Sequence, residues 1–190
     1  PQFPAITFGM ETALLDLANG GKRIIYDNDF IQGIPIPING LIWMGDPHFM
    51  RMQIDQKIAL GFRCIKLKIG GLDFGSECDV LSYIRDQYKR ENIQIRLDAN
   101  GAFSTEFALP RLKELSKFNI HSVEQPIRPG LAEMEFLCRM SPIPIALDEE
   151  LIGVESRESK LELLHRVMPQ FIVLKPTLHG GLSGCKEWIE

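Results

Sequence analysis

From Pro37 onward, short apolar runs alternate with longer charged segments of helical periodicity. The apolar runs are rich in β-branched residues and end in polar residues, which is typical of strands. Six strands are predicted, at Ile38–Trp43, Cys64–Ile69, Ile93–Asp98, Ile120–Glu124, Ile143–Asp148 and Phe171–Lys175. Helices are predicted at 46–60, 76–90, 104–117, 131–140, 156–167 and 182–190. This alternation predicts an α/β fold in which crossover helices join parallel strands.

Residues that favour helix starts support several of these boundaries. Ser76 and Ser104 precede the second and third helices, and Asp46 precedes a proline at the first helical position of another. The chain before Pro37 differs, because Ala13–Ala18 resembles the apolar part of a helix and Gly20-Gly21 ends it. Residues 22–30 are expected to form a strand or a connection. We therefore predict a helix and connection over residues 1–36 and a barrel domain over 37–190.

The alternation within the strands distinguishes two architectures. Ile65, Leu67 and Ile69 share one face of their strand, whereas Lys66 and Lys68 share the other. The strands at 93–98 and 143–148 are also apolar on one face only. A doubly wound sheet is covered by helices on both faces and needs strands that are apolar on both. The pattern therefore favours a (β/α) barrel of the TIM type, with charged side chains in its interior.

Length and charge limit this prediction. A complete eight-fold barrel needs about 250 residues, so 190 residues predict an incomplete barrel of about six βα units. The 21 basic and 25 acidic residues give a formal net charge of −4. No basic excess is available to hold phosphate groups, so nucleic-acid binding is not predicted.

The cysteines and the hydropathy concern the cellular location. The four cysteines are spaced widely and irregularly, which favours reduced thiols in a cytoplasmic protein over a zinc cage or a disulfide framework. The chain does not open on a charged segment followed by an apolar run, so no signal peptide is expected. The longest uncharged stretch, residues 30–45, contains two prolines and three glycines and is not expected to cross a membrane.

Charged residues recur where the predicted strands end. Lys68, Asp98, Glu124, Asp148 and Lys175 follow one another at intervals of about one βα unit. The carboxyl ends of barrel strands share one rim, where barrel enzymes keep their active sites. Three carboxylates from successive strands form a hard oxygen ligand set suited to Mg²⁺. A lysine on each side of this set offers proton-transfer groups.

The local sequences around these residues carry a family resemblance. Lys66-Leu67-Lys68, Asp98-Ala99-Asn100, Glu124-Gln125-Pro126, Asp148-Glu149 and Lys175-Pro176 together resemble the enolase superfamily, in its muconate-lactonizing-enzyme-like subgroup. Two longer segments, at 37–45 and 178–189, look like those of the o-succinylbenzoate synthases of menaquinone biosynthesis. The motifs of this resemblance span residues 66–176, and the two longer segments flank them.

The resemblance implies specific roles. Asp98, Glu124 and Asp148 would bind one Mg²⁺, or Mn²⁺, which would hold a substrate carboxylate and stabilise an enediolate. Lys68 would remove the α-proton and then assist loss of hydroxide. Lys175 would stabilise the anion from the opposite side. The reaction would be a hydro-lyase step on a cyclohexadiene carboxylate, 2-succinyl-6-hydroxy-2,4-cyclohexadiene-1-carboxylate (SHCHC), giving o-succinylbenzoate.

The resemblance also implies supporting residues. Lys66 would help to neutralise the substrate carboxylate, and Asn100 would support the rim by hydrogen bonding. Gly181 would approach the substrate with its backbone, although the Gly180-Gly181 pair on its own favours a tight turn over a phosphate cradle. For His179, which follows the last strand, packing is favoured over substrate contact.

Two alternatives stay open. The same motifs serve dipeptide epimerases and N-acylamino acid racemases, in which two opposed lysines exchange the proton. The second alternative is a non-catalytic, truncated fragment, because whole members of the family carry an N-terminal capping domain and further strands that we do not find here. A small carboxylate is the expected partner, with no membrane and no nucleic acid, and the oligomeric state is not predicted.

Overall fold

The computed structural model describes residues 3–89 and 92–190. Its strands form one six-stranded sheet in which every neighbouring pair is parallel. The strands are β1 (Gly40–Ile42), β2 (Cys64–Lys68), β3 (Gln94–Asp98), β4 (Ile120–Glu124), β5 (Ile145–Leu147) and β6 (Phe171–Ile172). The helices are α1 (Pro4–Ala18), α2 (Pro47–Ala59), α3 (Phe74–Gln87), α4 (Thr105–Leu115), α5 (Glu133–Met140), α6 (Arg157–Val167) and α7 (Gly181–Ile189), with 3₁₀ turns η1 (Ser116–Phe118) and η2 (Glu149–Leu151).

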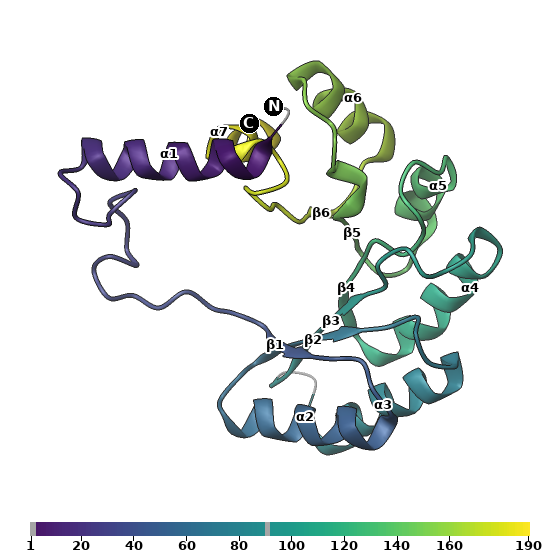
Figure 1. Ribbon diagram of the computed structural model, residues 1–190. Coiled ribbons are helices and arrows are strands. Elements are labelled where there is room, and N and C mark those ends of the chain that lie inside the picture. The colour runs from purple at the N-terminus through teal and green to yellow at the C-terminus, as the bar shows by residue number, and fades with distance from the viewer. Residues whose placement is uncertain (1–2, 90–91) are drawn as a thin grey trace. The chain divides into compact units, whose positions relative to one another are not determined.

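The strand order distinguishes a barrel from a doubly wound sheet. The strands lie side by side in chain order, from β1 to β6, without the reversal that a doubly wound sheet contains. Helices α2 to α5 lie on the same side of the sheet (Figure 1). This is the winding of a (β/α) barrel, and it confirms the predicted fold class. The strands β1 and β6 form the two edges of the described sheet.

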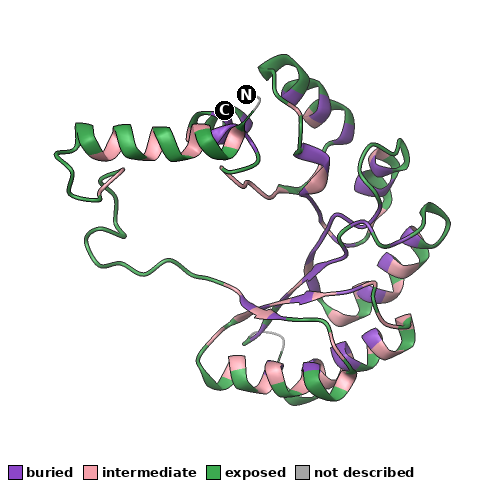
Figure 2. Ribbon diagram, in the orientation of Figure 1, coloured by how far each residue is buried: buried purple, intermediate pink, exposed green. Residues whose placement is uncertain are grey.

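The core follows the alternation within the strands. Ile65, Leu67, Ile95 and Leu97 are at most 1% exposed, whereas Lys66 on the opposite face is only partly buried. Buried helix residues such as those of α3 and α4 pack on the apolar face, and the buried colour concentrates along the strands and the helix sides that face them (Figure 2). Each fully buried aliphatic side chain contributes about 1.5–3 kcal/mol. The apolar face therefore stabilises the sheet and leaves the other face available for charged groups.

Several predicted boundaries are wrong by a few residues. Helix α3 begins at Phe74, because the side chain of Asp73 accepts from the Ser76 N–H and caps the helix two residues earlier than predicted. Its predicted end, residue 90, lies outside the described residues. The outer strands are also shorter than predicted: β6 ends at Ile172 and does not reach Lys175.

The N-terminal region has a longer helix than its apolar pattern indicates. Helix α1 begins at Pro4, with proline in the first turn, and ends at Ala18. Residues 22–30 form turns and bends, so they are a connection and not a strand. The predicted cap at Asp46 is confirmed, because its carboxylate accepts from the N–H groups of His48 and Phe49.

The chain is divided into two compact units, which are described separately below. The sheet unit comprises residues 38–150 and 166–172 and contains all six strands. The helical unit comprises residues 1–37, 151–165 and 173–190 and contains α1, α7 and most of α6.

Candidate active site

Two lysines on β2 face away from the apolar core of the sheet unit. Their register partners on β3 are Arg96, opposite Lys66, and Asp98, opposite Lys68. Side chains that alternate with buried isoleucine and leucine must point to the other face. The sequence pattern K-x-K therefore places two ammonium groups on one face of the same strand.

Two carboxylates meet these lysines at the ends of β3 and β4. Asp98 and Glu124 are register partners, and both are buried. The Lys66 ammonium bridges them, with Nζ 2.6 Å from Glu124 Oε2 and 3.1 Å from Asp98 Oδ2. The Lys68 ammonium lies 2.7 Å from the same Asp98 Oδ2. The structure thus joins four of the residues predicted from the sequence in one charged cluster.

Asn100 extends the cluster beyond the end of β3. Its Oδ1 accepts from the Lys68 ammonium at 2.5 Å, and its Nδ2 donates to Glu149 at 2.8 Å. Its backbone has φ +43°, a left-handed conformation that asparagine adopts more readily than most residues. The turn directs the side chain back toward Lys68. The supporting role of Asn100 in a reaction stays a prediction.

Gln125 was not among the residues predicted for the site. It is fully buried, and its Oε1 accepts from the N–H groups of Asp148 and Glu150 at 3.2 and 3.1 Å. Its Nε2 donates to Glu150 and to the Ile127 carbonyl. Gln125 has φ +39°, a strained conformation of the kind that clusters at functional sites. This one amide ties the end of β4 to the chain that follows β5.

Asp148 follows β5 directly and is 1% exposed. It acts on Glu124 through its charge: burial raises the pKa of Glu124 to about 7, and repulsion by Asp98 and Asp148 adds to this rise against the opposing ion pair with Lys66. Asp98 and Asp148 are therefore both close enough to Glu124 to oppose its charge. A glutamate with a pKa near neutrality marks a functional site candidate.

For Asp98 and Lys66, in contrast to Glu124, the surroundings favour the charged form. Burial opposes ionisation of Asp98, but the hydrogen bond from Lys68 and the charge of Lys66 outweigh burial and lower the pKa of Asp98. Burial also opposes the charge on Lys66, but the ion pairs with Glu124 and Asp98 raise the pKa of Lys66. The cluster holds its charges because they are paired, as buried charges require.

The donor set fits a hard divalent cation. Carboxylate oxygens at the ends of three adjacent strands are the ligands that Mg²⁺ prefers, and the mutual repulsion at Glu124 indicates a local excess of negative charge. Over residues 3–89 and 92–190, however, no three acidic, histidine or cysteine side chains are grouped as a metal site. Lys66 lies between two of the three carboxylates. The ligand set of Asp98, Glu124 and Asp148 stays a prediction.

The remaining predicted residues belong to the helical unit. Lys175 lies three residues beyond β6, where its carbonyl accepts from the N–H groups of Leu178 and His179 at 2.8 and 3.0 Å. Gly181 is the first residue of α7, and its N–H donates to the Pro176 carbonyl at 2.8 Å. Its φ of +82° requires glycine, which supports the tight turn. The roles of Lys175 and Gly181 toward a substrate stay predictions.

The family model for the enolase C-terminal domain-like family matches residues 50–190. The chain belongs to this enolase C-terminal domain-like family. The resemblance inferred from the K-x-K, D-x-N, E-Q-P, D-E and K-P motifs is thereby confirmed at the level of the superfamily.

Two relatives illustrate the similarity of the chain to proteins of defined activity or structure. It is 50% identical over its whole length to an o-succinylbenzoate synthase from Desulfotalea psychrophila, of which it covers 52%. A crystal structure of MenC from the same organism matches at a TM-score of 0.90 and 49% identity, over 98% of this chain and 52% of that one. A crystal structure of a dipeptide epimerase from Cytophaga hutchinsonii, complexed with Mg and the dipeptide D-Ala-L-Val, matches at a TM-score of 0.73 and 25% identity, over 81% of this chain and 41% of that one.

The chain spans about half the length of these relatives. Among the residues that the structure describes, no helix has both the length and the apolar character needed to span a membrane.

Proposed function

We propose that this chain is the metal-binding core of an o-succinylbenzoate synthase, a lyase that removes water from SHCHC to give o-succinylbenzoate. The observation that carries the proposal is the cluster of Lys66, Lys68, Asp98 and Glu124 along three adjacent strands. The 50% identity to an o-succinylbenzoate synthase over the whole chain supports the choice of substrate.

The chemical difficulty of this reaction is the weak acidity of a proton beside a carboxylate. Negative charge that develops there needs a fixed positive environment in a site with little water. Mg²⁺, or Mn²⁺, held by Asp98, Glu124 and Asp148 would supply such a charge beside the substrate carboxylate. Lys66, already in the same cluster, would add its ammonium to the neutralisation of that carboxylate.

Of the two other lysines, Lys68 would transfer the proton and Lys175 would balance the negative charge. Lys68 would take the α-proton in its neutral form and return it to the departing hydroxyl, so that water leaves. Its contacts with Asp98 and Asn100 fix the direction of Nζ before reaction, which is what a base requires. Lys175 would carry the positive charge that faces the developing anion.

The substrate test uses the natural protein in which these 190 residues occur. Purified protein with Mg²⁺ is assayed with SHCHC and, separately, with N-succinyl amino acids. We expect rapid conversion of SHCHC, followed by the absorbance of the aromatic product, and slow or undetectable racemisation. Racemisation without SHCHC turnover would contradict the proposal.

A second candidate is epimerisation or racemisation of a dipeptide or an N-acylamino acid. It is favoured by the presence of both Lys68 and Lys175 and by the likeness to the dipeptide epimerase structure. Deuterium exchange at the α-carbon distinguishes the roles of the lysines. Lys68→Ala should abolish wash-in of deuterium from D₂O, and persistent wash-in would rule Lys68 out as the base.

A non-catalytic fragment is the alternative from another class. Circular dichroism and a Mg²⁺ titration of the 190-residue chain test it, because a ligand that binds only the folded state raises the melting temperature. A folded chain that Mg²⁺ stabilises supports the metal core. A chain whose melting temperature does not respond to Mg²⁺ counts against it.

The proposal also includes the cytoplasm as the location and a small carboxylate as the partner. All four cysteines are free, and burial raises the pKa of each thiol, for Cys138 to about 12, which keeps them protonated and unreactive. Free, unreactive thiols are typical of proteins from reducing compartments.

A further inference from the structure

The loop that leads from Lys175 to helix α7 is closed by its own hydrogen bonds. The Lys175 carbonyl accepts from the N–H groups of Leu178 and His179, and the Pro176 carbonyl accepts from Gly181. Strand β6 ends at Ile172, so Lys175 has no place in the sheet ladder. The position of its backbone therefore depends on this loop and on what holds the loop.

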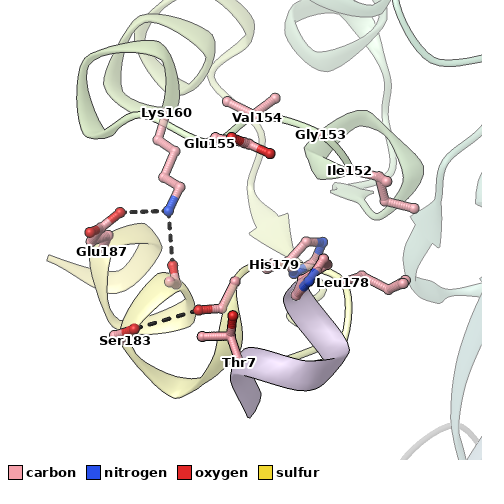
Figure 3. A pocket seen from close by; sticks show the side chains of 13 residues that line it. Thr7, Ile152, Gly153, Val154, Glu155, Lys160, Leu178, His179, Ser183 and Glu187 are labelled. Atoms are coloured by element: carbon pink, nitrogen blue, oxygen red, sulfur yellow. Dashed lines mark hydrogen bonds and ion pairs between the residues drawn. The ribbon is translucent and has the colours of Figure 1, made fainter. Parts of the chain in front are cut away.

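The side chain of His179 binds the backbone of Lys175. His179 Nδ1 lies 3.0 Å from the Lys175 nitrogen and accepts its N–H, which requires an unprotonated Nδ1. His179 is 5% exposed and lies in the wall of a cavity of about 470 Å³ within the helical unit (Figure 3). A buried acceptor of this kind fixes the peptide plane of Lys175 from one side.

Helix α7 in turn holds His179. The Trp188 ring packs edge-on against the imidazole at 6.5 Å, and a Cβ at Gly184 would collide with the His179 carbonyl. Figure 3 shows Lys160 reaching α7, where its ammonium donates to the Gly184 carbonyl and pairs with Glu187. Glycine is needed at 184 because the His179 carbonyl approaches its Cα closely. Helix α7 therefore supports the loop directly.

Glu11 of helix α1 fixes the first turn of α7. Its carboxylate accepts from the N–H groups of Leu182 and Ser183 and from the Ser183 hydroxyl. Burial opposes the charge, but these hydrogen bonds outweigh burial and lower the pKa of Glu11. A carboxylate is favoured at the positive end of a helix. A Cβ at Gly181 would collide with this carboxylate, so both glycines of the helix have packing roles.

We propose that His179 is a positioning residue for Lys175, and that Glu11 anchors the helix on which His179 rests. The inference depends on the proposed function, in which the Lys175 ammonium faces the developing anion. A lysine side chain is long and flexible, so the place of its ammonium depends on where the backbone is held. A displacement of about 1 Å can cost a factor of about 100 in rate.

The test compares three substitutions at residue 179 in the natural protein that contains this chain. Asparagine places an oxygen near the position of Nδ1, glutamine places its amide near Nε2, and leucine has no acceptor. We expect His179→Leu and His179→Gln to lower kcat for SHCHC by about 100-fold with little change in KM. His179→Asn should recover most of kcat. His165→Asn, at an exposed position of α6, is the matched control and should leave both constants unchanged.

Equal kcat values for the asparagine and glutamine variants would overturn the inference, even if the leucine variant does not fold. A loss confined to melting temperature, with wild-type kcat in His179→Leu, would overturn it as well.

Glu11→Ala should lower kcat about 10-fold, and Glu11→Gln, which keeps an acceptor, should lower it less. Lys175→Ala separates the two proposals: wild-type turnover contradicts the proposed role of Lys175, whereas an inactive Lys175→Ala beside a fully active His179→Leu contradicts only the role of His179.

Discussion

Two lysine–glutamate pairs, in which the lysine is buried or partly buried, have the same length and different surroundings. Lys66 pairs with Glu124 at 2.6 Å in the sheet unit, and Lys160 pairs with Glu187 at 2.6 Å in the helical unit. The first pair shares its space with Asp98, Asp148 and Lys68, and Glu124 is raised to a pKa of about 7. In the second pair, Glu187 keeps 43% of its side chain exposed. The N–O distance alone therefore does not distinguish the pair in the candidate active site from the pair between two helices.

The difference lies in charge balance and access to water. At the strand ends, burial and the carboxylates of Asp98 and Asp148 disfavour the charge on Glu124. An added cation would therefore stabilise the ionised glutamate. In the helical unit, one lysine meets one glutamate and the Gly184 carbonyl, and solvent reaches the glutamate. The first arrangement suits a ligand, and the second suits the docking of α6 against α7.

The largest expected effect is on metal binding and turnover. Glu124→Gln should remove the rise in melting temperature expected with Mg²⁺ and lower kcat by about 100- to 1,000-fold, because it removes the charge of a carboxylate that we propose as a metal ligand. Glu187→Gln, at a lysine pair of equal length, is the matched control and should keep the Mg²⁺ response. A Glu124→Gln protein that Mg²⁺ still stabilises as in the wild type would contradict the assignment of Glu124 as a ligand.

The next effect is on stability and concerns the helical unit. Glu187→Leu should lower the free energy of unfolding by about 2 kcal/mol, because it leaves the buried Lys160 charge with the Gly184 carbonyl and the Trp188 ring but without a carboxylate to balance it. Lys160→Met should cost about 1 kcal/mol, since Glu187 can turn to water. Urea unfolding of both variants measures the order, and a larger loss in Lys160→Met would show that the buried ammonium is not the costly group.

A smaller effect is the pH dependence of the metal-free sheet unit. The pKa of Glu124 is raised from 4.5 to about 7 in the folded state, so the folded protein binds a proton in this window that the unfolded chain has released. The contribution of Glu124 to the free energy of unfolding therefore decreases as the pH rises from about 4.5 to about 7. Asp98, whose pKa is lowered, contributes with the opposite sign and loses its stabilising effect as the pH falls.

Glu124→Gln removes the contribution of Glu124 to this pH dependence. In EDTA at pH 8 the variant should be more stable than the wild type by on the order of 1 kcal/mol, and at pH 4.5 the two should be nearly equal. Urea unfolding across this range measures both values. A difference that stays constant with pH would show that the glutamate is not destabilised by its surroundings.

The smallest effect is expected at exposed pairs. Lys117 and Glu114 lie 2.6 Å apart, with 65% and 44% of their side chains exposed. Lys117→Met should change the free energy of unfolding by only a few tenths of a kcal/mol, because solvent screens such pairs. A loss above 1 kcal/mol in urea unfolding would mean that proximity, and not burial, governs all the pairs compared here.

Much of the sheet unit could be predicted from strand parity. The alternation of Ile65 and Leu67 with Lys66 and Lys68 gave the apolar face, the charged face and the architecture, because a strand has only two faces. The intervals between Asp98, Glu124 and Asp148 placed them at neighbouring strand ends. The sequential strand order and the contacts of Asp98 and Glu124 agree with that interpretation.

Other features could not be predicted in this way. Gln125 carries no charge and follows a predicted ligand, so neither its charge nor its parity distinguished it, although its place after a strand end was a signal that could have been used. The lysine bridge at Lys66 depends on side-chain rotamers, which no spacing rule fixes. The bond from His179 to Lys175 arises from a loop, where periodicity gives no information.

The amide of Gln125 has a consequence for hydrogen exchange. The N–H groups of Asp148 and Glu150 donate to a side chain and not to a neighbouring strand. Their exchange with solvent deuterium is therefore governed by local opening around one buried amide, and less by the unfolding of the sheet. Protection factors at these two positions thus report whether Asp148 is held in place in a protein with neither substrate nor metal bound.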